Sequence, residues 1–76
     1  MTLTGRQIRE ARKLLGLQRS RLASKVGFIT TLVILRAEEN EDRPLPIEQA
    51  TAIRRVLERA GIEFGLEGVR LRMAEL

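Results

Sequence analysis

The 76-residue chain contains no cysteine and no histidine. The absence of cysteine excludes a disulfide framework, and the absence of both residue types excludes the usual zinc cluster. The commonest general base and the thiol nucleophile are therefore both missing. Ser20 and Ser24 have no acid–base partner within reach in the sequence. The sequence predicts a protein that is not an enzyme and that has no cofactor or metal.

Aromatic residues and long apolar runs are also scarce. Phe28 and Phe64 are the only aromatics, and the longest uncharged run, residues 26–35, is far too short to span a bilayer. The opening residues MTLTGRQ lack the basic-then-apolar pattern of a signal peptide. We therefore expect a cytoplasmic protein with no membrane contact. A chain this short forms a single thin core and buries only about 60% of its unfolded surface.

Charge is distributed unevenly along the chain. Residues 1–36 carry eight basic side chains and one acid, a net charge of +7, whereas residues 37–76 carry a net −3, and the whole chain is +4. A segment this basic attracts polyanions. Most of its basic residues are arginine, whose planar fork suits phosphates and guanine edges. The alternative is a solvated basic surface without a partner.

Two N-terminal helices are indicated by capping signals and apolar spacing. The first begins after Thr4, which can form a capping box with Gln7, and ends at Gly16. The second is expected over residues 19–26 and ends at Gly27. Helical spacing gives each of them one apolar face. The residues of these faces are Ile8, Ala11, Leu14, Leu15, Leu22, Ala23 and Val26.

Residues 29–35 are rich in β-branched side chains, as strands are. We nevertheless predict a third helix, capped by Thr30 or Thr31 and running to about Glu39, because a lone strand between helices would have no partner. A polar loop with two prolines follows, and a fourth helix begins near Pro46, which suits the first helical position. Its predicted apolar side consists of Ile47, Ala50, Ile53, Val56, Leu57 and Ala60.

Beyond Gly61, apolar and charged side chains alternate on either side of a glycine-flanked connection, which is typical of a small hairpin. The predicted fold class is mainly α: a small helix-turn-helix bundle of four or five short helices in residues 1–61. A short β-strand or hairpin and a tail occupy residues 62–76. The alternating apolar positions are Ile62, Phe64, Val69, Leu71 and Met73.

A tight glycine turn between the second and third of four short helices, together with a basic N-terminal half, is the plan of helix-turn-helix DNA-binding modules. Residues 7–27, QIREARKLLGLQRSRLASKVG, resemble the opening of lambda-repressor-like helix-turn-helix proteins of the xenobiotic-response-element type. RPLPIEQATAIRRVLERAGIEF and the later GVRLR resemble the end of short bacterial regulators in that family. The resemblance covers most of the chain. It implies a transcription regulator that binds double-stranded DNA as a homodimer, through a bundle of about five helices whose last helix is here replaced by the β element.

The second helix would lie across the DNA backbone and the third would enter the major groove. The family usually has Ser and then Gln at the start of the second helix, where this chain has Gln and Arg. Those two side chains can still bond a phosphate, and two arginines of the first helix, Arg6 and Arg9, would add to the positive field. The predicted DNA-binding residues are Gln18, Arg19, Lys25, Thr30, Thr31 and Arg36.

The third helix departs from the family, whose outward positions there are usually polar. Here some of Leu32, Ile34 and Leu35 must face outward, and such side chains can at best touch a thymine methyl group. Two registers are open. Counting forward from the glycine turn buries Val33, whereas counting back from the AEEN run and the first proline buries Ile34.

An acidic run ends the third helix and begins the loop. Its spacing is not that of a calcium site, so we expect a solvated acidic loop, which would repel phosphate. The alternative function is a protein-interaction or antitoxin-like module on the same fold, with the apolar third helix as its docking surface. The edge of the C-terminal strand offers a second surface for a protein partner. The acidic run consists of Glu38, Glu39, Glu41 and Asp42.

Overall fold

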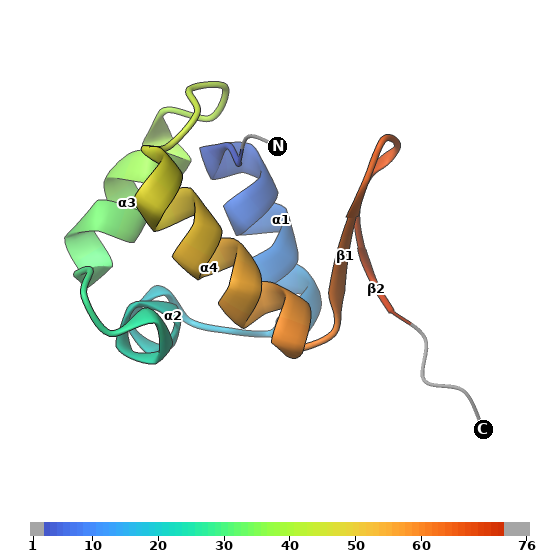
Figure 1. Ribbon diagram of the computed structural model, residues 1–76, viewed down its shortest axis with the longest axis horizontal. Helices are drawn as coiled ribbons and strands as arrows, with labels where there is room; N and C mark the ends of the chain where they lie inside the picture. Colours follow the sequence, from blue (N-terminus) through green and yellow to red (C-terminus); the bar gives the residue numbers. More distant parts are fainter. Residues whose placement is uncertain (1–2, 73–76) are drawn as a thin grey trace.

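The computed structural model describes residues 3–72, which form four helices and a two-stranded antiparallel hairpin (Figure 1). This arrangement confirms the predicted fold class. Met73, which was expected to continue the second strand, lies outside the described residues. The elements are α1 Gly5–Leu15, α2 Arg19–Val26, α3 Thr31–Glu39, α4 Ile47–Arg59, β1 Ile62–Gly65 and β2 Gly68–Leu71.

The ends of α1 and α2 follow the local signals of the sequence. The Thr4 backbone nitrogen donates to Gln7 Oε1 at 2.9 Å, and the Thr4 hydroxyl accepts from the Gln7 backbone, so the capping box is present. Gly16 and Gly27 end the two helices with φ of 63° and 97°, a left-handed conformation that glycine adopts without steric cost. Local sequence therefore sets the lengths of both helices.

The β-branched third segment is helical, as predicted, and Thr30 caps it by accepting a hydrogen bond from the Val33 backbone. Ile34 is fully buried, whereas Val33 is only half-buried. The register counted back from the acidic run is therefore correct. One turn later, Glu38 is also buried, at 2% exposure. Leu32 is 50% exposed on the opposite side of α3.

Three apolar positions that were expected to face the core do not. Leu14 of α1 is 45% exposed, Ile47 at the start of α4 is 77% exposed, and Ala60 is exposed at its end. Helix α4 also begins one residue later than expected, because Pro46 is its N-cap and not its first helical residue. The core itself contains Leu3, Ile8, Ala11, Leu22, Ala23, Ile34, Ala50, Ile53, Leu57 and Ile62.

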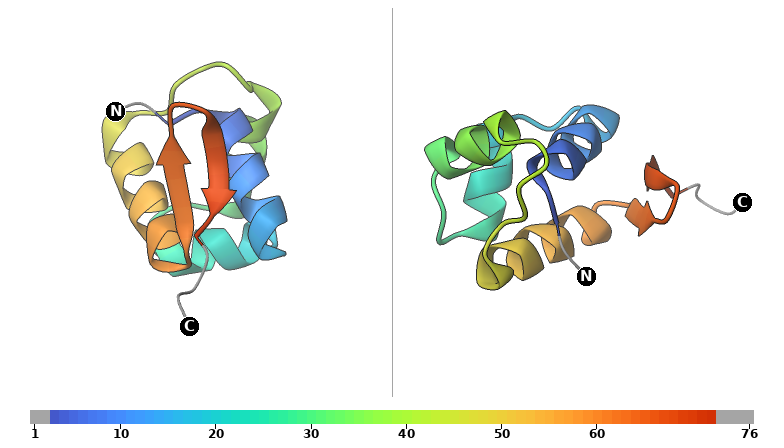
Figure 2. Two further views of the ribbon diagram at one scale, coloured as in Figure 1. Left: turned by 90° about the vertical axis from the view of Figure 1, so that its right-hand side faces the viewer. Right: turned by 90° about the horizontal axis from the view of Figure 1, so that it is seen from above.

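The hairpin lies over α1 and α4, with β2 in contact with α1 and β1 in contact with α4 (Figure 2, left). Ile62 pairs with Leu71 and Phe64 with Val69, so the four apolar side chains share the face toward the helices. The Arg54 guanidinium of α4 lies 5.6 Å from the centroid of the Phe64 ring, a cation–π contact that joins α4 to β1. Within residues 3–72, no helix is long and apolar enough to cross a membrane.

The start of α1 is held against the end of α3 at very short range. A β-carbon on Gly5 would overlap the backbone carbonyl of Ala37, so only glycine fits at this point. The following loop is fixed to the same end of α1, because the Leu45 backbone nitrogen donates to the Leu3 carbonyl oxygen at 3.0 Å. These contacts hold the acidic run beside the arginines of α1.

Candidate nucleic-acid interface

Helices α2 and α3 are joined by residues 27–30 and pack against each other, with α1 on α3 and α4 on α2 (Figure 1). The left-handed conformation at Gly27 reverses the chain, and Thr30 starts α3. Leu22 of α2 and Ile34 of α3 are fully buried in the shared core. The pair therefore has the helix-turn-helix connectivity that the sequence predicted.

One exposed ridge of α2 gathers polar and basic side chains. Gln18, Arg21 and Lys25 are spaced by three and four residues, so they lie along one side of the helix, and all three are exposed. Neither basic residue forms an ion pair among the residues that the structure describes. Arg21 was missed by the sequence prediction, although its spacing of four from Lys25 could have indicated it.

Arg19 lies on a different side of α2 from this ridge. Its Nε donates to Glu38 Oε1 at 3.1 Å, and its side chain is 41% exposed. Its terminal guanidinium nitrogens have no hydrogen-bond partner within residues 3–72. Arg19 is thus oriented by its contact with α3, and its predicted contact with phosphate stays a prediction.

The partner of Arg19 is the buried carboxylate of Glu38, which also binds Arg12 of α1 in a bidentate pair. Arg12 Nε lies 2.6 Å from Oε2, and Arg12 Nη2 lies 2.8 Å from Oε1. Arg12 Nη1 also donates to the Leu17 carbonyl oxygen at 3.0 Å. The carboxylate therefore joins α3 to α1 and α2, and Arg12 also binds the α1–α2 connection.

Burial by itself raises the pKa of Glu38, because it disfavours the charged carboxylate. The hydrogen bond and charge of Arg12 act in the opposite direction, followed by those of Arg19. Their combined effect is larger, so the pKa lies below its ordinary value of 4.5. Glu38 is therefore ionised at neutral pH, as a partner of two guanidinium groups must be.

Two of the three remaining acids of the run, Glu41 and Asp42, also reach α1. Arg6 Nη2 lies 3.1 Å from both Glu41 Oε2 and Asp42 Oδ1, and Arg9 Nη2 is paired with Glu41 Oε1. Glu39 remains exposed without an ion pair in the described part of the chain. The prediction of a solvated acidic loop is therefore wrong for Glu38 and Glu41, because counting charge along the sequence cannot show pairing between segments about thirty residues apart.

This pairing changes where the positive charge of the N-terminal half is available. The four arginines Arg6, Arg9, Arg12 and Arg19 are engaged by the acidic run. The basic side chains of residues 1–36 that have no ion pair within the described residues are Lys13, Arg21, Lys25 and Arg36. Three of these four belong to α2 and α3, so the available positive charge is concentrated on the helix-turn-helix pair.

The exposed side chains of α3 do not form a single polar surface. Thr31 and Arg36 are both exposed, but five residues of helix separate their directions by about 140°. Leu32 lies on the same ridge as Arg36, one turn earlier. The Thr30 hydroxyl already accepts the capping hydrogen bond of α3. The structure therefore brings Thr30, Thr31 and Leu32 together at the start of α3 and leaves Arg36 at its end.

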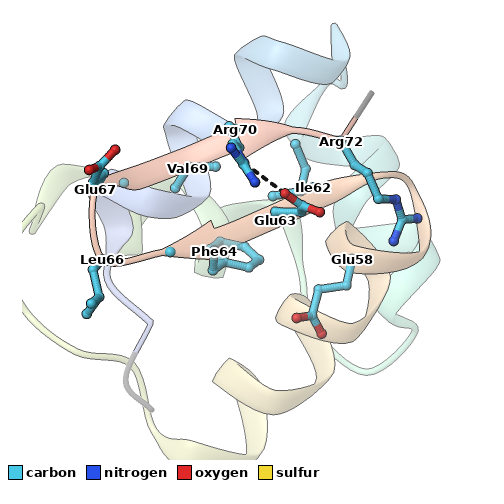
Figure 3. A pocket seen from close by; sticks show the side chains of 11 residues that line it. Glu58, Ile62, Glu63, Phe64, Leu66, Glu67, Val69, Arg70 and Arg72 are labelled. Atoms are coloured by element: carbon cyan, nitrogen blue, oxygen red, sulfur yellow. Dashed lines mark hydrogen bonds and ion pairs between the residues drawn. The ribbon is translucent and has the colours of Figure 1, made fainter. Parts of the chain in front are cut away.

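Hollows lie beside α3 and at the hairpin. One, of about 670 Å³ and mainly apolar, lies between the end of α3 and the start of α4, beside Arg36 and Arg43. The other, of about 830 Å³, is lined by both strands of the hairpin and by Glu58 of α4, and at this hollow Arg70 Nε lies 2.8 Å from Glu63 Oε1 (Figure 3). Across residues 3–72, no three acidic side chains are grouped closely enough to hold a metal ion.

No protein-family model, curated protein or solved structure matches the chain.

Proposed function

We propose that the protein is a DNA-binding transcriptional regulator of the helix-turn-helix type, which acts in the bacterial cytoplasm as a homodimer on a two-fold operator. The resemblance of residues 7–27 to lambda-repressor-like proteins implies this function. The observation that carries the proposal is the exposed basic ridge of α2, Gln18, Arg21 and Lys25, on the helix that precedes the turn into α3.

The ridge supplies the phosphate contacts. Lys25 and Arg21 each neutralise one phosphate and release its counterions, and Gln18 donates a hydrogen bond to a third. The terminal nitrogens of Arg19, whose Nε is fixed by Glu38, add a preoriented contact. Because Glu38 and Glu41 are already paired with arginines, the acidic run opposes this binding less than its sequence suggests.

Base recognition falls to the exposed residues of α3. The Thr31 hydroxyl can bond a base edge, Leu32 can contact a thymine methyl, and Arg36 can bond guanine O6 and N7. Because Thr31 and Arg36 point about 140° apart, the two do not read the same base step. We expect modest discrimination between sequences, with phosphate contacts contributing most of the affinity.

The test is duplex binding followed by fluorescence anisotropy from about 50 to about 200 mM salt. Affinity should fall steeply with salt, and Arg21→Ala or Lys25→Ala should each weaken binding and reduce the salt slope by about one. Arg70→Ala on the hairpin is the matched control, since it removes an exposed arginine away from α2 and α3. If micromolar protein does not bind duplex at about 50 mM salt, the proposal is wrong.

The exposure of Leu32 favours a second candidate, a protein-interaction or antitoxin-like module in which α3 is the docking surface. A half-exposed leucine in the first turn of α3 suits burial against a partner. In this case Leu32→Glu abolishes capture of the partner and Lys25→Ala leaves it unchanged. Under the DNA-binding function, Lys25→Ala has the larger effect on the measured complex.

A further inference from the structure

We propose that the exposed face of α4, together with Phe28, binds a second copy of this chain in a two-fold antiparallel helix pair. The inference assigns a surface to the homodimer proposed above. It does not depend on DNA binding, because self-association can be measured with no DNA present.

Apolar side chains are exposed where α4 meets the turn between α2 and α3. Ile47 is 77% exposed and Phe28 is 63% exposed. Phe28 is one of only two aromatic residues in the chain, and it is not used in the core. The right-hand view of Figure 2 shows α4 along one side of the molecule, with the turn beside its beginning. A hollow of about 340 Å³ lies there, lined by Phe28, Ile47, Glu48, Thr51, Ala52 and Arg55.

The α4 residues of this hollow form a stripe with small side chains at its centre and opposite charges at its ends. Glu48, Thr51, Ala52 and Arg55 follow a spacing of three, one and three, so they share one side of the helix. Neither Glu48 nor Arg55 forms an ion pair with any residue that the structure describes. Two unpaired opposite charges on one stripe are therefore available to a partner.

This pattern is complementary to itself. A two-fold axis midway between Thr51 and Ala52 places Glu48 of each copy opposite Arg55 of the other, because both lie three and a half residues from the axis. Two identical ion pairs form, about 10 Å apart along the helix. A parallel arrangement would instead place like charges together. The antiparallel two-fold pair is thus the arrangement that satisfies both charges of both copies.

The centre of the stripe permits close contact between the helices. Thr51 and Ala52 are small, so two α4 helices can approach to the ordinary interaxial distance of about 8–10 Å. Phe28 and Ile47 lie beside the stripe and extend the buried area with apolar surface, twice over in a two-fold pair. The available apolar surface and the reciprocal charges therefore favour the same occupant, a second copy.

Sedimentation velocity on a protein concentration series, without DNA, tests the assignment. Glu48→Arg or Arg55→Glu alone converts two attractive pairs into two repulsive ones and should raise the dimer dissociation constant by about tenfold or more. The double variant Glu48→Arg/Arg55→Glu restores both pairs with their signs exchanged and should return the constant to near its original value. Glu10→Arg and Lys13→Glu, charge reversals on the exposed face of α1, are the matched controls and should change nothing.

Thermal unfolding followed by circular dichroism checks that each variant is folded. Arg55→Glu lies outside the first turn of α4, so it also provides a variant that leaves the N-terminal charge of the helix intact. A wild-type chain that stays monomeric at millimolar concentration overturns the proposal, as does a double variant that fails to restore association. The monomeric Arg55→Glu protein should still bind duplex DNA through the α2 ridge of a single copy. Such binding would show that loss of the dimer is separate from a failure of the DNA-binding proposal.

Discussion

The buried carboxylate of Glu38 on α3 and the guanidinium of Arg12 on α1 form a bidentate ion pair with nitrogen–oxygen distances of 2.6 and 2.8 Å. The pair joins residues 26 positions apart in the sequence, and Arg19 completes it from α2. Three of the four helices are thus fixed to one charged group, which sets the position of α3 relative to α2. That position determines how the exposed side chains of α2 and α3 are placed relative to each other.

Removal of the carboxylate should strongly destabilise the fold. Glu38→Ala leaves the Arg12 side chain, only 12% exposed, without its partner, and we expect the free energy of unfolding to fall by about 3 kcal/mol. Urea unfolding followed by far-ultraviolet circular dichroism measures the change. Glu39→Ala, one residue later and exposed, is the matched control and should cost less than about 0.5 kcal/mol. Equal effects of the two substitutions would contradict the structural role of Glu38.

The same carboxylate should make stability depend on pH. Its pKa in the folded protein lies below the ordinary 4.5, so its contribution is fully present above pH 4.5 and is lost as the pH falls through the folded-state pKa. The free energy of unfolding should therefore decrease on acidification below pH 4.5. Glu38→Gln should make this decrease shallower, which urea unfolding at a series of pH values can measure. An unchanged slope in the Gln variant would show that other carboxylates account for the acid sensitivity.

Substitution of Arg19 should lower the stability of the fold, whereas substitution of Lys25 should not. Arg19→Ala removes a hydrogen bond to the buried carboxylate, so we expect a loss of about 1 kcal/mol in the free energy of unfolding. Lys25→Ala, at an exposed position of the same helix, should leave the stability within about 0.5 kcal/mol of the original. Thermal and urea unfolding of the two variants check this difference. A neutral Arg19→Ala would mean that the Arg19–Glu38 contact contributes nothing to stability.

Gly5 should be intolerant of any side chain. A β-carbon there would overlap the Ala37 carbonyl, so Gly5→Ala must force α1 and α3 apart, and we expect a cost of about 2 kcal/mol or more. Gly65→Ala is the matched control, because its β-carbon would meet the nearest atom, the Gly68 carbonyl oxygen, at an ordinary 3.8 Å. The melting temperatures of the two variants give the comparison. A stable Gly5→Ala protein would contradict the close contact between the two helices.

Much of the fold could be predicted because its signals are local. The Thr4–Gln7 capping box, the glycine stops at 16 and 27, and the alternation around Phe64 and Val69 each act within a few residues, and each is present in the structure. The helical state of the third segment was predicted from its neighbours, although its composition favours a strand. Burial of Ile34 selected between two registers that local signals left equal.

The candidate site was predictable only in part. Exposure of Gln18, Lys25, Thr30, Thr31 and Arg36 agrees with their expected place on the surface. The direction of Arg19 was not predictable, since it depends on a carboxylate nineteen residues away. The exposure of Ile47 was missed for a similar reason. Helical spacing assigns it to the apolar side of α4, and only the packing of the neighbouring elements decides whether that end of the helix is covered.

The sequence by itself determined where α1 and α2 begin and end, that a hairpin follows the helices, and that positive charge predominates in the N-terminal half. Helix caps, glycine stops and the alternation of apolar and charged residues depend on residues that are close in the sequence, so the sequence alone can predict them. The tertiary structure alone decided which charges are available. It placed Glu38, in the last turn of α3, against arginines of α1 and α2, because burial of Ile34 brings Glu38, one turn later, into the same interface. Coulombic pairing depends on distance in space, and that distance is set by how the core packs.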